Sequence, residues 1–539
     1  MDNAKERWAA LQSNGGSEAG KRGPQVVSAP SYMLLGFSRH APAASQPIGR
    51  SSLGARLPPS DVARRGDQPT PMRIDSFLTA FLAAAFLVGP AGLAADKPTR
   101  PNIVFILFDD LGYGEPPGYR AGSPFKMPTL DRLAGEGMRF TDAHTASAVC
   151  TPTRYGVLTG RYPMRIGQFG VLTTFSPPII ERERLTVASL LKQQGYHTAA
   201  FGKWHLGMNW NLPPDFTKSE KAIPSGTVVT DGPITRGFDV FSGYTHARTI
   251  GMVMEQDRVA MNVEPVEVQP LLTKKAVAYI EERAKASEPF FLYVPLCTPH
   301  LPLVPAAEFV GKGGAEKYAD WMFQGDWVTG QILDALDRHR LSADTLVIVT
   351  SDNGAEHRVY PPLRESKRSI YEGGHRVPFL ARWPGRIKPG STCDDVICLN
   401  DLMATAAEIT GTKLPADAAE DSVSILPDLL GIARKPVREA TVHQSVAGDL
   451  AIRQGPWKLI FKRNGVRELY NLGDDVSETK DVLASHADIA ERLAKLMQSS
   501  ITNGRSTPGL PQNNQHDIQL EGPAKKKNAG RQPRANSPS

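Results

Sequence analysis

Residues 102–110 read NIVFILFDD, a continuous apolar run that ends in two acids, and this stretch decides the fold class. Three later segments repeat the plan: HTAAFGKWH at 197–205, PFFLYVPLCTPH at 289–300 and TLVIVTSDN at 345–353. Each is typical of a buried strand that ends in polar, titratable residues. Open α/β sheets place ligands at the carboxyl ends of their strands, so we expect one site where these four ends meet.

Helical patterns lie between the predicted strands. They have apolar residues near a 3.6-residue period and cover residues 127–138, 185–195, 272–285 and 327–340. This alternation predicts an α/β domain over residues 96–435, with a large, mixed but mostly parallel sheet flanked by helices. From residue 436, short alternating segments broken by Gly and Pro predict a smaller antiparallel sheet, closed by a helix over residues 485–501, as a C-terminal subdomain over 436–502.

Both ends of the chain differ from this body. Residues 1–71 show no sustained apolar period and are predicted to be disordered or to precede the true start at Met72. Residues 72–94 have a charged start, a short apolar middle and a small-residue end, the layout of a signal peptide, with an internal core helix as the alternative. We therefore expect a secreted or periplasmic protein without a stable membrane anchor. The tail over 503–539 is predicted to be disordered.

The charge distribution argues against a nucleic-acid-binding protein. The formal net charge of the chain is +6, but residues 1–95 and 503–539 contribute +4 each, which leaves residues 96–502 at −2. The basic charge therefore belongs to the flanking tails rather than to the body, and nucleic-acid binding loses its main support. A hydrophobic content of 41% and a charged content of 22% are those of a globular protein.

The chain has four cysteines, at 150, 297, 393 and 398, too few for a disulfide framework. Cys393 and Cys398 flank the strand-like sequence DDVI, so a bridge between them would need a turn there, and this is left open. Cys297 ends an apolar run and is expected to be a buried core thiol.

Cys150 begins the sequence CTPTR, which precedes a helical pattern. Thr151 is a candidate helix cap, with Pro152 as the first helical residue, where the missing N–H costs nothing. Cys150 would then lie at the positive end of a helix dipole, which favours an anion. Arg154 follows one turn later, where its guanidinium could meet the same anion.

Oxygen ligands come from two of the predicted strand ends. Asp109 and Asp110 follow the first strand, and Asp352 and Asn353 follow the last. Hard oxygen donors suit Ca²⁺ or, with tighter geometry, Mg²⁺, and disfavour thiolate-rich transition-metal chemistry. A pair of acids at the end of a buried strand also needs a partner for its charge.

The run CTPTR at 150–154, followed by LTGRYPMRIG at 158–167, resembles the signature of type I sulfatases, the formylglycine-dependent arylsulfatase family of the alkaline phosphatase superfamily. The likeness continues through PNIVFILFDDLGYGE, FGKWHLG, TPHLPL, SDNGAE and KRSIYEGGHRVPFLARWPG, in family order. It implies that a formylglycine-generating enzyme oxidises Cys150 to an aldehyde. It also implies that Asp109, Asp110, Asp352 and Asn353 bind one Ca²⁺ together with the modified residue 150.

The same resemblance implies roles for other polar residues. Lys203 and Lys367 would contact the sulfate, His205 would lie close to the hydrated aldehyde, and His300 would contact the leaving group. Lys367 lies near two arginines, and only the following YEGG sequence singles it out. Thr245, in the sequence GYTHA, corresponds to a substrate-side position on a short match.

The expected activity is hydrolysis of sulfate monoesters, with aryl sulfates in assay and carbohydrate sulfates in nature. Two alternatives stay open. The first is a phosphatase or phosphonate monoester hydrolase of the same superfamily. The second is an unmodified protein that binds sulfated glycans without turning them over.

Overall fold

The computed structural model describes residues 100–520, except 315 and 434, and the predictions for residues 1–94 and for the tail beyond 520 lie outside this part. In the described part, ten strands form one sheet. In pairing order they are β13 (Ser391–Cys393), β2 (Met138–Phe140), β12 (Phe379–Arg382), β11 (Thr345–Ser351), β1 (Asn102–Asp109), β10 (Phe290–Pro299), β4 (His197–Lys203), β7 (Val240–Tyr244), β8 (Met252–Glu255) and β9 (Arg258–Asn262).

The centre of this sheet is parallel. Strands β11, β1, β10, β4 and β7 pair in parallel, whereas β12 and β8 join on either side in antiparallel fashion. The four strands quoted from the sequence are therefore neighbours, with their carboxyl ends at one edge. This confirms the prediction of a mixed, mostly parallel sheet.

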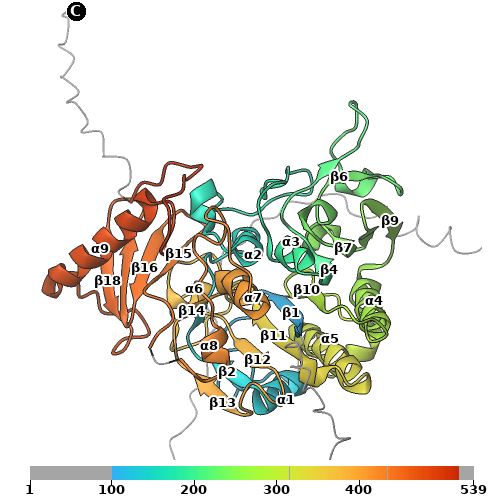
Figure 1. The fold of residues 1–539 in the computed structure, drawn as a ribbon, viewed down its shortest axis with the longest axis horizontal. Coiled ribbons are helices and arrows are strands. Elements are labelled where there is room, and N and C mark those ends of the chain that lie inside the picture. Colours follow the sequence, from blue (N-terminus) through green and yellow to red (C-terminus); the bar gives the residue numbers. More distant parts are fainter. Residues whose placement is uncertain (1–99, 315, 434, 521–539) are drawn as a thin grey trace, which may run out of the picture. The chain divides into compact units, whose positions relative to one another are not determined.

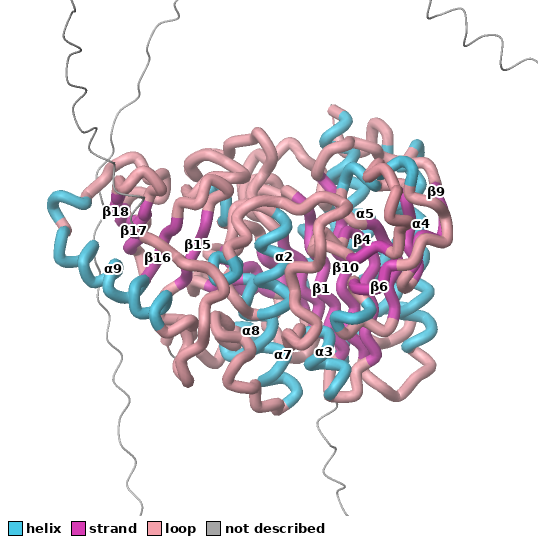
Figure 2. Tube along the Cα trace, turned by 90° about the horizontal axis from the view of Figure 1, so that it is seen from above, coloured by secondary structure: helices cyan, strands magenta, loops and turns pink. Residues whose placement is uncertain are grey.

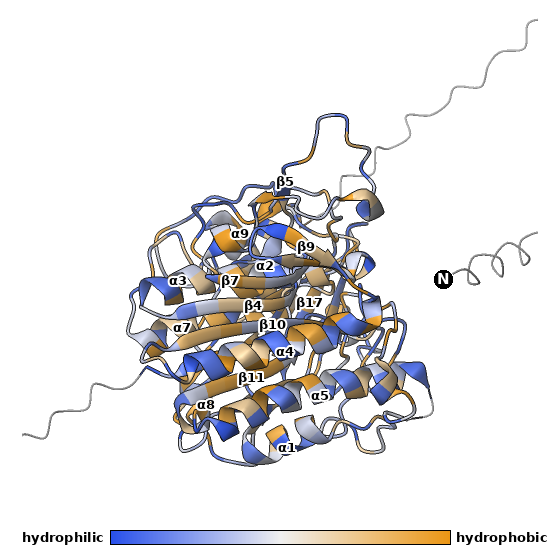
Figure 3. Ribbon diagram, turned by 90° about the vertical axis from the view of Figure 1, so that its right-hand side faces the viewer, coloured by the Kyte–Doolittle hydropathy of each residue, from blue (hydrophilic) through white to orange (hydrophobic). Residues whose placement is uncertain are grey.

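Helices cover both faces of the sheet. Along β1, Val104 and Ile106 pack with α1 (Pro128–Glu136), α4 (Pro265–Arg283) and α5 (Lys317–Arg338), which lie side by side over the strands in Figure 3. The alternate residues Phe105 and Leu107 pack on the other face with α2 (Cys150–Thr159), α3 (Val187–Gln193) and α7 (Leu402–Thr410). Every residue of β1 is buried, as expected for a strand between two helical layers.

Two helices begin well before their predicted starts. Helix α4 runs from Pro265 through an internal Pro270, although the pattern predicted a start at 272, beyond this helix-breaking residue. Helix α5 starts at Lys317 rather than 327. The shorter elements are β3 (Ala143–His144), β5 (Asn209–Trp210), β6 (Val229–Asp231), β14 (Ile397–Cys398), α6 (Glu372–His375) and α8 (Leu426–Leu429).

The C-terminal sheet is antiparallel, as predicted. Its strands are β15 (Thr441–Gln444), β16 (Leu450–Gln454), β17 (Trp457–Phe461) and β18 (Arg467–Asn471), and α9 (Ala487–Thr502) lies across them in Figures 1 and 2. Ile452 and Leu459 pack against Leu493 and Met497 of α9. The helix begins after Ser485, which belongs to a preceding 3₁₀ turn.

The tail beyond α9 differs from its prediction. Residues 503–520 have a defined path and pack against the body instead of being disordered. Arg161 donates to the Asn513 carbonyl at 2.7 Å, and the Gln515 amide donates to the Arg165 carbonyl at 2.7 Å. Two fully buried arginines thus have partners here, which the polar composition of the tail did not indicate.

A buried polar network fixes the C-terminal sheet to the α/β body. It consists of Asp142, His144, Glu372, His375, His443, Arg453 and Lys458. Lys458 on β17 bonds to Glu372 at 3.0 Å, and the ring of His443 on β15 stacks on that of His375 with centroids 4.0 Å apart. These contacts cross between the two predicted domains, so the domains share a buried interface.

All four cysteines are free thiols, so Cys393 and Cys398 are not bridged. Cys297 is buried, as expected for a core thiol. Among residues 100–520, leaving aside 315 and 434, no helix is both long and apolar enough to cross a bilayer.

Candidate active site

The sheet brings the predicted oxygen ligands together. Asp109 ends β1 and Asp110 follows it, while Asp352 and Asn353 follow β11, the parallel neighbour of β1. The Asp110 amide donates to Asp352 Oδ1 at 3.2 Å, and Asn353 Nδ2 donates to Asp110 Oδ1 at 2.7 Å. All four side chains are buried. The sequence prediction that two strand ends meet therefore holds.

Cys150 lies at the first position of α2, with Val149 as the N-cap. The helix begins earlier than expected, because Thr151 is not its cap. The hydroxyl of Thr151 instead donates to the His205 carbonyl at 3.0 Å and accepts from the Leu172 amide at 3.2 Å. Cys150 is thus held at the positive end of the helix, next to the end of β4. Burial raises the pKa of its thiol, so unmodified Cys150 is a poor nucleophile.

Three cationic side chains neutralise the three acids. Lys203 Nζ lies 2.6 Å from Asp109 Oδ2, and Lys367 Nζ lies 2.6 Å from Asp110 Oδ1. Arg154 contacts Asp352 through Nε at 3.0 Å and Nη2 at 2.8 Å, and is fully buried. The protein's own charges therefore balance, and an added divalent cation would give the site a positive surplus that attracts an anion.

Arg154, which the sequence predicted near the anion site, is engaged by neighbouring groups of the protein. Its guanidinium holds Asp352, lies 3.6 Å from Asp109 and donates to the Lys203 carbonyl at 3.0 Å. It fixes the ends of three strands relative to one another. The ammonium groups of Lys203 and Lys367 are compact point charges that line the neighbouring cavity.

The acids differ in their proton affinity. Burial alone would raise the pKa of Asp109, but the charges of Lys203, His300 and Arg154 hold it well below its usual range. Burial and the neighbouring charge of Asp109 raise the pKa of Asp352 to about 7. A cation near Asp352 would favour its charged form and lower its pKa.

Two buried oxygen atoms at the strand ends have no hydrogen-bond partner among the described residues: Asp109 Oδ1 and Asn353 Oδ1. One ligand atom each of Asp109, Cys150 and Asp352 lies within 4.8 Å of the others. Buried acceptors without donors are costly unless they coordinate something. A hard divalent cation such as Ca²⁺ fits this donor set.

Two histidines, His205 and His300, lie beside Cys150 and the strand-end acids. His205 Nε2 donates to the Leu172 carbonyl at 3.0 Å, which leaves its buried Nδ1 as an acceptor without a partner among the described residues. Burial, and then the charge of Lys203, hold the pKa of His205 well below its usual value, so the ring is uncharged at neutral pH. His300 follows β10, is partly exposed, and places Nε2 at 3.8 Å from Asp110 Oδ2.

Both histidines line a cavity of about 140 Å³, which has room for a tetrahedral oxyanion. Its lining includes Cys150, Leu172, Lys203, His205, His246, Arg248, His300, Lys367 and Arg368. Thr245 is not among the residues that line it and lies beside His205 and His246, with its hydroxyl bonded to Thr249 at 2.6 Å. The next residue, His246, does line it and is held by Thr174 at 2.7 Å and Glu220 at 3.1 Å.

The structure also distinguishes Lys367 from Arg364, whereas Arg368 lines the same cavity. Lys367 is buried at the cavity, and its ammonium contacts Glu356 as well as Asp110. Arg364 points elsewhere, stacking over Tyr371 with 3.6 Å between its guanidinium carbon and the ring centroid. Glu356 was not predicted as a site residue, since nothing in its sequence distinguishes it from an exposed loop acid.

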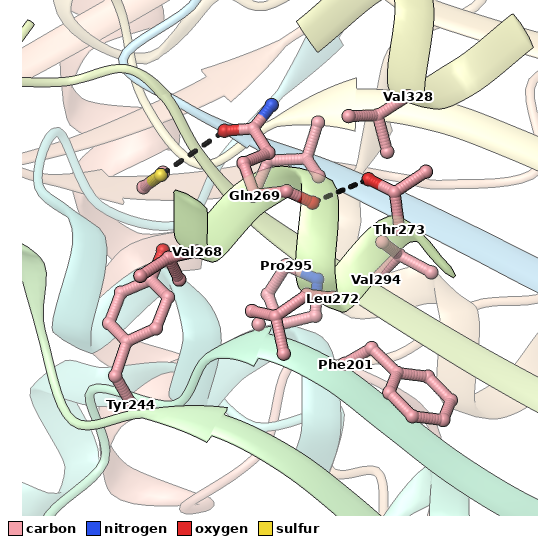
Figure 4. A pocket seen from close by; sticks show the side chains of 12 residues that line it. Phe201, Tyr244, Val268, Gln269, Leu272, Thr273, Val294, Pro295 and Val328 are labelled. Carbon is pink, nitrogen blue, oxygen red and sulfur yellow. Dashed lines mark hydrogen bonds between the residues drawn. The ribbon is translucent and has the colours of Figure 1, made fainter. Parts of the chain in front are cut away.

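A second, much smaller pocket lies between α4, β10 and β7 (Figure 4). It measures about 20 Å³, room for about one water molecule, and its walls are mainly apolar. Cys297 donates to Gln269 Oε1 at 3.3 Å beside it. This pocket is a packing defect rather than a substrate site.

Comparison with known proteins decides the family. A model described as Sulfatase matches residues 101–412, and one described as N-sulphoglucosamine sulphohydrolase, C-terminal, matches residues 356–505. The chain belongs to the sulfatase family. As a sulfatase it is a hydrolase of sulfuric esters, and the family matches cover both the α/β body and the C-terminal sheet.

Similar sulfatases come from bacteria and animals. The chain is 32% identical to an N-acetylgalactosamine-6-O-sulfatase of Bacteroides thetaiotaomicron, over 74% of this chain and 93% of that protein. It is also 32% identical to human arylsulfatase A, over 74% and 81%. A solved structure from a study of glycosaminoglycan metabolism by Bacteroides thetaiotaomicron aligns with a TM-score of 0.67 at 28% identity, covering 74% of this chain and 99% of that one.

Proposed function

We propose that this sulfatase hydrolyses sulfate monoesters of carbohydrates, and small aryl sulfates in assay, through a formylglycine made from Cys150 and a bound Ca²⁺. The observation that carries the proposal is the position of Cys150. It begins α2 at a cavity lined by Lys203 and Lys367, beside carboxylate and amide oxygens that lack partners. A buried thiol with a raised pKa would be a poor nucleophile there, whereas a modified side chain with hydroxyl groups would be a better one.

The chain's own residues bind and orient the anion. Lys203 and Lys367 are buried ammonium groups that line the cavity beside Asp109 and Asp110, and each can donate to a sulfate oxygen. The N-terminus of α2 adds partial positive charge. Asp109, Asp110, Asp352 and Asn353 would hold a divalent cation, which would supply positive charge toward a bound sulfate. A formylglycine at position 150, once hydrated, would supply the nucleophilic hydroxyl and a second hydroxyl through which sulfate could be released.

Proton transfer falls to the two histidines. His205 is neutral, and its Nδ1, which has no hydrogen-bond partner among the described residues, can accept a hydrogen bond from a hydroxyl of the modified residue 150. His300 is the candidate acid, because it lines the cavity and its side chain is partly exposed, so it could reach a departing alcohol. Its Nδ1 bonds to the Leu301 carbonyl and its own carbonyl accepts from Trp321 at 3.0 Å, which fixes the ring's position.

Relatives support the carbohydrate assignment. They include proteins named N-acetylgalactosamine-6-O-sulfatase and arylsulfatase A. A solved phosphonate monoester hydrolase shares the fold at 17% identity and a TM-score of 0.54, so the fold alone does not choose between sulfate and phosphonate. Loops 209–235 and 355–366 are expected to select the sugar, since loops carry specificity on a rigid sheet.

Two measurements test the proposal. The mass of the peptide containing residue 150 should be that of formylglycine when the chain is produced with a formylglycine-generating enzyme. Turnover of sulfated sugars and of an aryl sulfate should then exceed turnover of the matching phosphate and phosphonate esters. Preference for a phosphorus ester, or no turnover despite complete modification, would contradict the assignment.

We also propose that the chain is exported, as a secreted or periplasmic enzyme. The layout of residues 72–94 supports this. N-terminal sequencing of the exported protein should find a start near Ala95, whereas a mature chain that retains residues 1–71 would contradict it.

A further inference from the structure

A second group of potential metal ligands lies at the edge of the large sheet. It comprises Cys393 at the end of β13, Asp395 just after it, and Asp428 on α8. The Cys393 sulfur and one carboxylate oxygen from each aspartate all lie within 4.8 Å of one another. In the sheet order, β13 is the edge strand and is separated from β1 by β2, β12 and β11. The group is therefore distinct from the active site.

Asp428 is the unusual member. Its exposed fraction is 3%, and both carboxylate oxygens are buried without a hydrogen-bond donor among the described residues. Within residues 100–520, except 315 and 434, no ion pair involves Asp395 or Asp428. Burial, then the charge of Asp395, then a side-chain hydrogen bond that protonated Asp428 makes to Asp395, and last the charge of Asp401 raise the pKa of Asp428 to about 7. A cation between a buried carboxylate and a neighbouring acid would stabilise the charged forms of both.

We propose that Cys393, Asp395 and Asp428 bind a divalent cation of the zinc class, with water at the remaining position. One sulfur and two carboxylate oxygens suit Zn²⁺, whereas Ca²⁺ takes oxygen ligands. Burial raises the pKa of the Cys393 thiol to about 11, and the Asp395 backbone N–H opposes this by hydrogen bonding to the sulfur. Binding the cation forms the metal–sulfur bond and releases the thiol proton to solvent, together with any proton held by Asp428.

The site would have a structural role. Strand β13 is three residues long and pairs on one side only, with β2. Helix α8 is a four-residue element that follows a long connection from α7. A cation shared by Cys393 and Asp428 would tie this short helix to the exposed edge of the sheet, where hydrogen bonds alone provide few constraints.

The test uses Co²⁺ as a spectroscopic probe on the full chain. The Cys150→Ser background, with excess Ca²⁺, prevents a contribution from the active-site sulfur. We expect one Co²⁺ per chain with thiolate-to-cobalt charge-transfer absorption, displaced by stoichiometric Zn²⁺. The Cys393→Ser and Asp428→Asn variants should lose this absorption. The matched control Cys398→Ser, five residues along, should keep it.

Thermal unfolding provides a second readout that does not depend on cobalt. Zn²⁺ should raise the Tm of the parent and leave that of Asp428→Asn unchanged. Without metal, Asp428→Asn should be at least as stable as the parent, because it removes an unpaired buried carboxylate. The proposal is overturned if no thiolate absorption appears, if it survives Asp428→Asn, or if Asp395 and Asp428 only share a proton and take up no cation.

Discussion

Replacing Arg154 by Met should destabilise the protein strongly in metal-free buffer and less in calcium. Arg154 is fully buried and is the ion-pair partner of Asp352, with Nη2 2.8 Å from its Oδ2. It also lies 3.6 Å from Asp109. Met retains much of the side-chain volume but leaves two neighbouring carboxylates with one less cation.

The magnitude follows from this geometry. Two unit charges 2.8 Å apart attract by about 6 kcal/mol at an effective dielectric constant of about 20. The cost of burying the guanidinium offsets part of this, and removal of one partner from a buried pair costs about 3–5 kcal/mol. A divalent cation bound by Asp109 and Asp352 replaces part of the lost charge, so calcium should recover a large share of the loss.

The assay is urea unfolding followed by tryptophan fluorescence, with EDTA and with excess calcium. The matched control is Arg165→Met. Arg165 forms an equally buried pair with Asp421, with both N–O distances at 2.7 Å, but Asp421 is not one of the predicted calcium ligands. Its loss should be similar in size and independent of calcium. Equal losses for Arg154→Met in both buffers would refute the assignment of Asp109 and Asp352 to a cation site.

Three further outcomes are expected. Chelation should abolish turnover and Ca²⁺ should restore it, as measured with an aryl sulfate; full activity in metal-free enzyme would contradict the cation site. Lys367→Met should lower kcat by about 10²–10³, the effect of losing one buried donor to developing charge, whereas Lys462→Met, a partly exposed lysine outside the cavity, should be near wild type. Burial and then the charge of His144 hold the pKa of the buried His443 far below its usual value, so below a pH of about 6.5 this position binds a proton only in the unfolded chain. His443 should therefore lower the free energy of unfolding by about 1.4 kcal/mol for each pH unit below about 6.5. His443→Asn should remove this contribution, and His357→Asn, at an exposed site, should not.

The sequence predicted the sheet and most of the site because the evidence was local. A run such as residues 102–110 contains both the buried strand and the acids that follow it, so the parallel arrangement puts Asp109, Lys203, His300 and Asp352 at one edge. The sequence does not show which side chains far apart along the chain are in contact. Arg154 was expected to meet an anion, and only the folded structure shows that Asp352 holds its guanidinium.

Other differences have similar causes. Thr151 is a residue type that often caps helices, but its hydroxyl bonds instead to the His205 carbonyl and the Leu172 amide. The tail after 503 is polar, and polarity alone predicted disorder. The order of residues 503–520 comes from partners more than 300 residues away, such as Arg161 and Arg165. Thr245 and His246 are adjacent, and only the local turn decides which of them faces the cavity.

The central claim, that residue 150 acts as formylglycine, is tested most directly by counting turnovers per chain alongside the peptide mass of residue 150. Enzyme modified at Cys150 should turn over an aryl sulfate many times. Cys150→Ser offers a single hydroxyl, so it should fold, accept at most one sulfate per chain and then stop. Repeated turnover by a chain whose residue 150 has the mass of unmodified cysteine would contradict the account.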